Sequence, residues 1–214
     1  MNPDLRELIE ELRTDLVADE DNTVSWGKIS AGAPTDKIPA EVPQPVRELM
    51  EVAESIAAGG FYLPGISSSA RMQGGLKIMP EYTGVAAEPD EWFYLGRLQE
   101  EPLLLRRDSG AVWYFPQTST DEWFMREAFQ EIAPGLDSFL AYYVFGAGYA
   151  EIGNDDDDWW RFLEEQDLTA PASRRTNERD AGGTHRALRG PTAMVARQAR
   201  DSRRSLSVEN SDDR

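Results

Sequence analysis

The chain of 214 residues carries a formal net charge of −17 and has no cysteine, and its only histidine is His185. This composition excludes disulfides and thiolate metal sites, and it leaves no histidine for catalysis before position 185. Residues 1–168 hold 12 Lys and Arg against 33 Asp and Glu, a net −21, whereas residues 169–214 hold 10 against 6, a net +4. An acidic body of this kind repels nucleic acid and attracts basic partners. Selection for solubility explains the acidity equally well.

The first predicted element is an amphipathic helix over residues 3–18. Leu, Ile and Val recur there at three- and four-residue spacing, Asn2 can cap the helix, and Pro3 suits its first turn. The segment is too charged to be a signal peptide, and no stretch reaches the roughly 18–20 apolar residues of a membrane span. We therefore expect a cytoplasmic protein that does not bind membranes.

Two elements are predicted next. Residues 23–28 favour a short strand with Trp26 pointing inward. An apolar stripe then predicts a helix over residues 45–58. Gly59 and Gly60 are expected to end this helix, because glycine adopts the left-handed conformation without steric cost.

The middle of the chain is predicted to be β-structure. Its candidate strands are residues 61–63, 75–79, 91–97, 103–107 and 111–115. A tight turn at Asp108-Ser109-Gly110 makes the last two strands the best predicted hairpin. Both faces of the strand around Phe93 are apolar, so we expect this strand to be central and covered on both sides.

Three more helices are predicted, at residues 121–132, 136–145 and 155–165. The order of the elements indicates one α+β domain over residues 1–168. We expect a largely antiparallel sheet of about five to six strands, flanked by N-terminal and C-terminal helices.

From Thr169 onward the regular pattern is lost. The segment is rich in Arg, Ala, Gly and Ser, and it contains no Phe, Trp or Tyr. Residues 169–214 are therefore predicted to be a disordered, Arg-rich tail. Its arginines are interpreted as part of an inert extension, with contact to nucleic acid or to the acidic body as alternatives.

Four consecutive aspartates at 155–158 form the most conspicuous polar run. Aspartate at a helix start accepts hydrogen bonds from free backbone N–H groups, so a helix cap is the favoured interpretation. Contact with a basic partner is the second. A metal site is least favoured, because calcium loops space their oxygen ligands at alternate positions around a glycine.

Other candidate chemistry is weaker. The glycines and serines of residues 65–75 lack the spacing of a phosphate-binding loop and are predicted to form a flexible loop. The aromatic residues after position 91 are interpreted as core side chains, with a ligand-stacking surface as the alternative. Two carboxylates could act as acid and base in hydrolysis, but 33 carboxylates leave no pair distinguished.

Several short pieces resemble those of one protein family. They are Ile38-Pro39, Gly59-Gly60-Phe61 after a helix, Phe93-Tyr94-Leu95-Gly96, the turn at 107–112 and the segment at 132–140. In this order they resemble the SUKH superfamily, bacterial immunity proteins related to a fungal regulator of cell-wall assembly. The resemblance covers residues 36–146. Residues 97–102 depart from the Gly-rich turn that this family often has, which leaves the subfamily open.

The resemblance implies that the protein is not an enzyme. Many SUKH proteins bind and neutralise a toxin domain, often a nuclease or a deaminase. The expectation is stoichiometric binding of a basic toxin domain, with no catalytic residue, cofactor or metal and no direct binding of nucleic acid by the body. The alternative is a regulatory or scaffold protein of the same fold in cell-wall or signalling assembly.

The candidate partner-binding residues are the acidic side chains expected to be exposed around the sheet. They are Glu88, Asp90, Glu91, Glu100, Glu101, Asp155, Asp156, Asp157 and Asp158.

Overall fold

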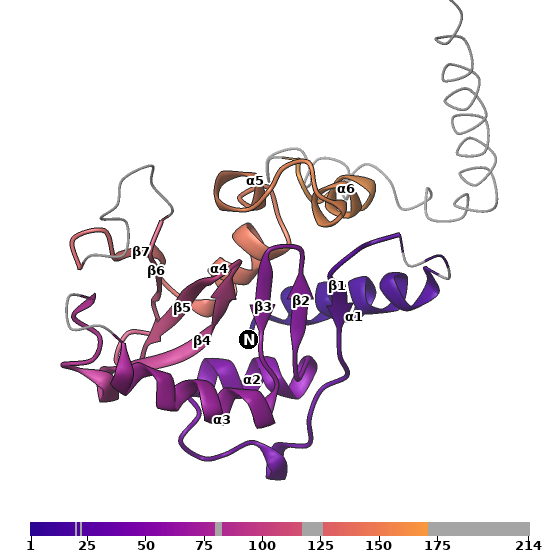
Figure 1. Ribbon diagram of the computed structural model, residues 1–214. Coiled ribbons are helices and arrows are strands. Elements are labelled where there is room, and N and C mark those ends of the chain that lie inside the picture. Colours follow the sequence, from indigo (N-terminus) through magenta and orange to yellow (C-terminus); the bar gives the residue numbers. More distant parts are fainter. Residues whose placement is uncertain (20, 22, 80–82, 117–125, 171–214) are drawn as a thin grey trace, which may run out of the picture. The chain divides into compact units, whose positions relative to one another are not determined.

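The computed structural model describes residues 1–170 apart from residues 20, 22, 80–82 and 117–125. Within these residues, seven strands form one sheet in chain order, and every neighbouring pair is antiparallel. The sheet is thus a meander (Figure 1), and the predicted α+β class with flanking helices is confirmed. The predicted disordered tail covers residues 169–214, and its residues from 171 onward lie outside the described part of the chain.

The strands are β1 (Gly27–Ile29), β2 (Ile56–Ala58), β3 (Phe61–Leu63), β4 (Trp92–Leu98), β5 (Glu101–Arg106), β6 (Val112–Tyr114) and β7 (Gln130–Ala133). The α-helices are α1 (Pro3–Ala18), α2 (Gln44–Val52), α3 (Ile66–Gly75), α4 (Leu136–Phe139), α5 (Tyr149–Ile152) and α6 (Asp158–Glu165). A π-helix over Leu140–Val144 continues α4, and short 3-10 helices occupy Thr35–Lys37, Leu76–Ile78 and Pro89–Glu91. Among the described residues, no helix is long and apolar enough to cross a membrane.

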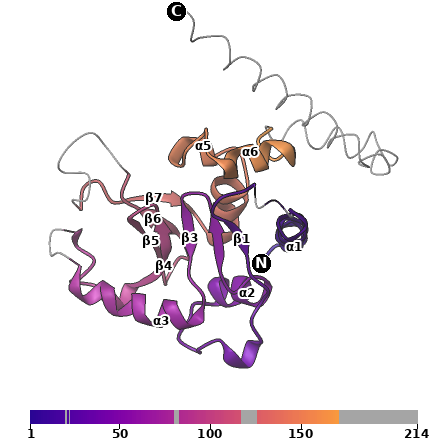
Figure 2. The ribbon, with the colours of Figure 1, turned by 45° about the vertical axis from the view of Figure 1, so that its right-hand side comes forward.

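Two apolar cores lie on opposite faces of the sheet. Phe93 and Leu95 of β4 belong to the larger core, together with buried side chains of α1, α2, α4 and α6. Trp92 of β4 belongs to the smaller core with Leu104 and Phe129. The prediction that this strand is central and covered on both sides is therefore confirmed. Figures 1 and 2 show α5 and α6 at one end of the sheet and α2 and α3 at the other.

The predicted helix over residues 45–58 is too long. α2 ends at Val52, residues 56–58 form β2, and Gly59 and Gly60 form the β2–β3 turn instead of a helix end. The cause is the pairing of residues 56–58 with β1, beside which the Ser30 N–H donates to the Ser55 carbonyl oxygen at 3.0 Å. This pairing joins residues far apart in the sequence, so local periodicity does not reveal it.

Residues 65–75 are not a flexible loop, and residues 75–79 are not a strand. They form α3 and the 3-10 helix that follows it. The side-chain amide of Gln73 donates to the carbonyl oxygen of Tyr94 at 2.9 Å and accepts from its N–H at 2.9 Å. β3 pairs with β4 only at Phe61↔Leu98 and Tyr62↔Arg97. Gln73 therefore provides hydrogen bonds to the backbone of β4 where β3 no longer pairs with it. These bonds hold α3 against the sheet.

The C-terminal predictions are confirmed in part. The hairpin at Asp108-Ser109-Gly110 and the helix at 136–145 are confirmed. The helix predicted at 155–165 begins at Asp158. In the helix predicted at 121–132, residues 121–125 lie outside the described part, and residues 130–133 are strand β7 paired with β6.

Candidate functional site

The candidate acidic residues between positions 88 and 101 lie at the two opposite ends of β4. Glu88, Asp90 and Glu91 come directly before this strand, and Glu100 comes directly after it. Seven strand residues span roughly 23 Å. These residues therefore belong to two separate surfaces.

At the Glu91 end of β4, an arginine of the same chain already pairs with carboxylates. The Arg106 guanidinium contacts the carboxylates of Glu91 at 2.8 Å and Asp108 at 3.1 Å. Glu88 and Asp90 are exposed. The predicted Glu91 contact is thus part of an ion-pair network within the chain, which weakens it as a binding residue for a basic partner.

The four aspartates at 155–158 have different roles. Asp157 caps α6 by accepting from the Trp160 N–H at 2.8 Å, and it also accepts from the Tyr149 hydroxyl at 2.5 Å. Asp158 pairs with Arg161 at 3.0 Å. The helix-cap interpretation is confirmed for Asp157. Asp155 and Asp156 are exposed and remain candidates for partner contact.

The β2–β3 turn joins these aspartates to two other segments. The Tyr149 hydroxyl accepts from the Gly60 N–H at 3.0 Å, and the Gln99 N–H donates to the Gly60 carbonyl oxygen at 2.6 Å. The Gly59 N–H donates to the Trp26 carbonyl oxygen at 3.1 Å. The turn therefore gathers Trp26, the β4–β5 turn and the start of α6 at one end of the sheet.

Trp26 was predicted to point inward, and this prediction is wrong. Its side chain is 77% exposed, and its backbone is left-handed with φ +58°. A bulky residue in this conformation is strained, and an exposed tryptophan gains nothing from burial in the free protein. The left-handed residue turns the chain before β1 begins at Gly27, which directs the indole outward. The sequence signal was available, since Trp26 sits alone between polar residues and a glycine.

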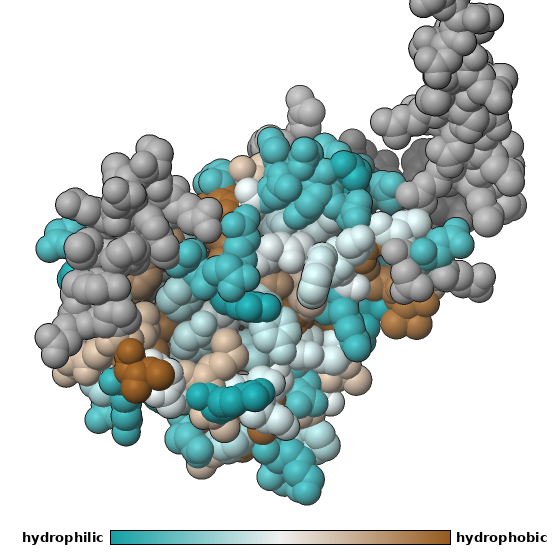
Figure 3. Space-filling view, in the orientation of Figure 1, coloured by the Kyte–Doolittle hydropathy of each residue, from teal (hydrophilic) through white to brown (hydrophobic). Residues whose placement is uncertain are grey.

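We call Trp26, Glu100, Asp155 and Asp156 the turn surface. Glu100 is 87% exposed and has only a long contact of 3.9 Å to Arg97. Hydrophilic side chains gather over α5 and α6 in Figure 3, at the same end of the sheet. An exposed indole can stack on a guanidinium or ammonium group, and carboxylates at the same end of the sheet can provide counterions for a cationic partner.

Glu101 was predicted to be exposed, but it is only 9% exposed. The β4–β5 turn has two residues, so Glu101 pairs with Leu98 inside the ladder and points to the same buried face. Burial, and next the neighbouring Glu100, raise the pKa of the Glu101 carboxyl. Glu101 is therefore a costly buried acid and not a contact residue.

Substitution of Glu101 with Gln is expected to stabilise the protein at pH 7 by about 1 kcal/mol, because the charged form is the one that burial penalises. Folding raises the pKa of Glu101, so the native state favours the protonated carboxyl. Its contribution to stability is therefore fully present below the ordinary pKa and is lost as the pH rises through the raised pKa. Denaturant unfolding at pH 7 and pH 4 should show the gain of Glu101→Gln shrinking at the lower pH. An equal gain at both values would contradict the assignment.

Several arginines of the body are used on main-chain oxygens instead of carboxylates. Arg13 donates to the Val52 carbonyl at 2.8 Å and Arg47 to the Pro39 carbonyl at 2.8 Å. Arg107 donates to the carbonyl oxygens of Glu41 at 2.9 Å and Trp92 at 3.0 Å. These contacts leave even fewer cations for the 33 carboxylates of residues 1–168.

The described residues contain no group of three or more His, Cys, Asp and Glu side chains that could hold a metal ion. Burial, and next the hydrogen bond to Asp157, raise the pKa of the Tyr149 hydroxyl above its ordinary value. Tyr149 therefore stays protonated at neutral pH and acts as a structural link in the turn.

Comparison with known proteins adds no assignment. No protein-family model matches the chain, and no curated protein matches it.

Proposed function

We propose that this protein is a non-enzymatic binding protein that neutralises a basic toxin domain, a nuclease or a deaminase, by stoichiometric association. The observation that carries the proposal is the turn surface, where a strained and exposed tryptophan lies at the same end of the sheet as Glu100, Asp155 and Asp156. Tryptophan is among the residues that most often dominate the energy of protein interfaces. Here it lies at the same end of the sheet as three exposed carboxylates, which favour a cationic partner.

The charge of the body supports a basic partner. The carboxylates exceed the cations by 21 in residues 1–168. Such a surface steers a basic protein into contact and imitates the phosphates that a nuclease or deaminase site attracts. Occupation of that site would exclude its nucleic-acid substrate without any chemical step.

The resemblance to SUKH proteins supports the same function. Of the quoted pieces, Phe93-Tyr94-Leu95-Gly96 lies on β4, the piece at 107–112 spans the β5–β6 turn, and the piece at 132–140 runs from β7 into α4. Gly59-Gly60-Phe61 departs from the family pattern, because it lies at the β2–β3 turn and not at the end of a helix. Family membership is part of the proposal, and the alternative of a scaffold protein in cell-wall or signalling assembly predicts no effect on any toxin.

Binding to the toxin domain encoded beside this gene tests the proposal. Isothermal titration calorimetry should show a 1:1 complex whose affinity falls at least about tenfold between roughly 50 and 200 mM salt. Lysine at Glu100, Asp155 and Asp156 together should weaken binding much further. The matched control places lysine at Glu7, Glu10 and Glu127, which are also exposed and give the same change in net charge. Equal losses in both triple variants would show that net charge, and not the turn surface, governs binding.

A further inference from the structure

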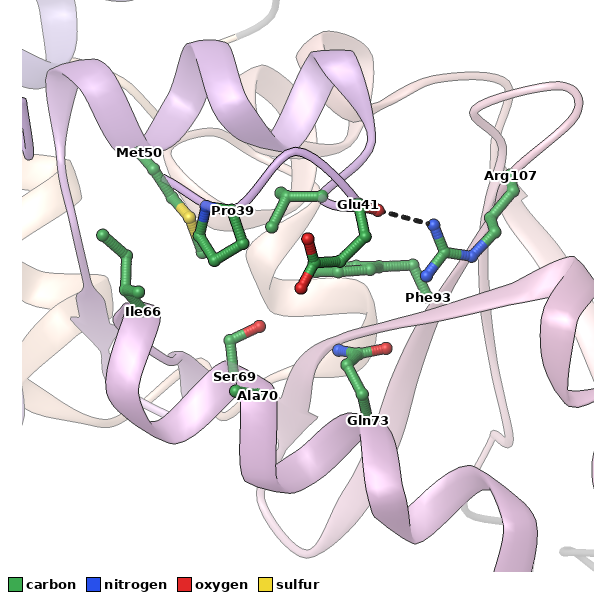
Figure 4. Close-up of a pocket in the computed structure, with 10 residues that line it drawn as sticks. Pro39, Glu41, Met50, Ile66, Ser69, Ala70, Gln73, Phe93 and Arg107 are labelled. Atoms are coloured by element: carbon green, nitrogen blue, oxygen red, sulfur yellow. Dashed lines mark hydrogen bonds between the residues drawn. The ribbon is translucent and has the colours of Figure 1, made fainter. Parts of the chain in front are cut away.

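A small hollow lies where β3 and β4 separate. Beyond Tyr62, β3 no longer pairs with β4. The side-chain amide of Gln73 in α3 hydrogen-bonds the backbone N–H and carbonyl oxygen of Tyr94 instead. The hollow opens between α3, the start of β4 and the segment before α2 (Figure 4). Its cavity volume of about 40 Å³ corresponds to roughly three or four water-sized sites. A space of this size suits the end of one side chain.

The walls of the hollow are largely apolar, and its polar lining consists of Glu41, Ser69, Gln73 and Arg107. The side chains of Gln73 and Arg107 hydrogen-bond main-chain atoms. Met50, Ile66 and Phe93 provide the apolar contacts. The carboxylate of Glu41 and the hydroxyl of Ser69 point into the hollow in Figure 4. Ser69 is only 4% exposed, so its hydroxyl is a buried polar group that faces this space.

Arg107 lies at the mouth of the hollow and is held there by three contacts. Its guanidinium donates to the main-chain oxygens of Glu41 and Trp92 and stacks over the Phe93 ring at 5.3 Å from the centroid. The hydrogen bond from Arg107 reaches the main-chain oxygen of Glu41, and the carboxylate of Glu41 points inward in Figure 4. The guanidinium of Arg107 therefore closes one side of the hollow, with its donors directed at main-chain oxygens and its face on Phe93, and the carboxylate of Glu41 is the anionic group of the lining.

We propose that this hollow binds the ammonium end of a lysine side chain carried by a protein partner. The last methylenes of the lysine would pack on Ile66 and Phe93, and its ammonium would donate to Glu41 and Ser69. An anion would meet the inward carboxylate of Glu41. A guanidinium is bulkier than the ammonium, which suits a space of this size less well. The inference is independent of the proposed function, because it names the chemistry of the hollow and not the identity of the partner.

The test uses n-butylammonium as a probe for the end of lysine, with 1-butanol and butyrate as neutral and anionic probes of similar length. Amide signals of Ser69, Ala70 and Gln73 in the full chain are followed by NMR during titration. We expect saturable shifts with n-butylammonium at millimolar concentration, as suits a ligand of so few atoms, and at least about tenfold weaker effects with the other two. Equal binding of 1-butanol, or preferred binding of butyrate, would overturn the proposal.

Variants at the hollow test separately whether binding needs the Glu41 charge and whether it needs the open space. Glu41→Gln keeps the shape of an exposed side chain and should weaken n-butylammonium binding at least about tenfold. Ala70→Trp should abolish binding by filling the mouth, whereas Ser67→Trp, an equally bulky change at an exposed position of α3 outside the hollow, should leave it unchanged. Unaltered thermal unfolding of Glu41→Gln would confirm its fold. Full binding in Glu41→Gln would contradict the assignment, and this result would not bear on toxin neutralisation.

Discussion

Substitution of Gly59 with Ala is expected to lower the free energy of unfolding by about 3 kcal/mol. Gly59 has φ +57°, a conformation that costs alanine about 1–2 kcal/mol. A Cβ atom at this position would lie 2.1 Å from the Tyr149 hydroxyl oxygen and 2.8 Å from the Trp159 Cβ. Tyr149 would have to move and lose its hydrogen bonds to Asp157 and Gly60, at about 1 kcal/mol each.

Gly110→Ala is the matched control for this prediction. Gly110 also has a positive φ of +75°, but a Cβ atom there would meet no other atom within 4 Å. Denaturant unfolding should therefore show a loss of only about 1 kcal/mol for Gly110→Ala. Equal losses in the two variants would mean that Gly59 is needed only for its backbone conformation, and that the packing of Tyr149 on the turn is not as described.

Substitution of Trp26 with Gly is expected to weaken partner binding about 30-fold or more while it slightly stabilises the free protein. A loss of this size is typical when a central aromatic residue of an interface is truncated. The free energy of unfolding should rise by about 0.5 kcal/mol. Glycine removes the strain of the left-handed backbone, and this gain exceeds the cost of the greater conformational entropy that glycine gives the unfolded chain. Opposite signs for affinity and stability are the signature of a residue kept for binding.

Ile78→Gly serves as the comparison for Trp26→Gly. Ile78 is 84% exposed, so it is an equally accessible apolar side chain outside the turn surface. Calorimetry with the partner should show an affinity close to that of the unmodified protein. A loss in Ile78→Gly as large as that in Trp26→Gly would place the interface elsewhere. A loss of stability in Trp26→Gly would show that the indole supports the fold.

Most of the fold could be predicted because its signals are local. The alternation around Phe93 and Leu95 reveals a strand buried on both faces, and Asp108-Ser109-Gly110 reveals a hairpin. The errors at β2 and β7 have a different cause, which is pairing between segments apart in the sequence. Gly59 and Gly60 fit a helix end and a hairpin turn equally well, and the choice depends on β1 about 30 residues earlier.

The candidate site was harder to predict than the fold. Exposed acidic runs could be found from composition, but their partners within the chain could not. The difference between Glu100 and Glu101 depends on a two-residue turn that sets the register of β5. The outward direction of Trp26 depends on one backbone angle. The position of Glu41 over the hollow depends on Arg107, which is distant in the sequence.

Neutralisation is tested most directly by titrating the enzymatic activity of the toxin domain encoded beside this gene. Increasing amounts of the full chain are added at a toxin concentration well above the dissociation constant. The proposed function predicts a linear fall in activity that reaches zero at one equivalent, with no loss of the added protein. Toxin activity that persists at a large excess of this protein, for every toxin encoded beside the gene, would contradict it.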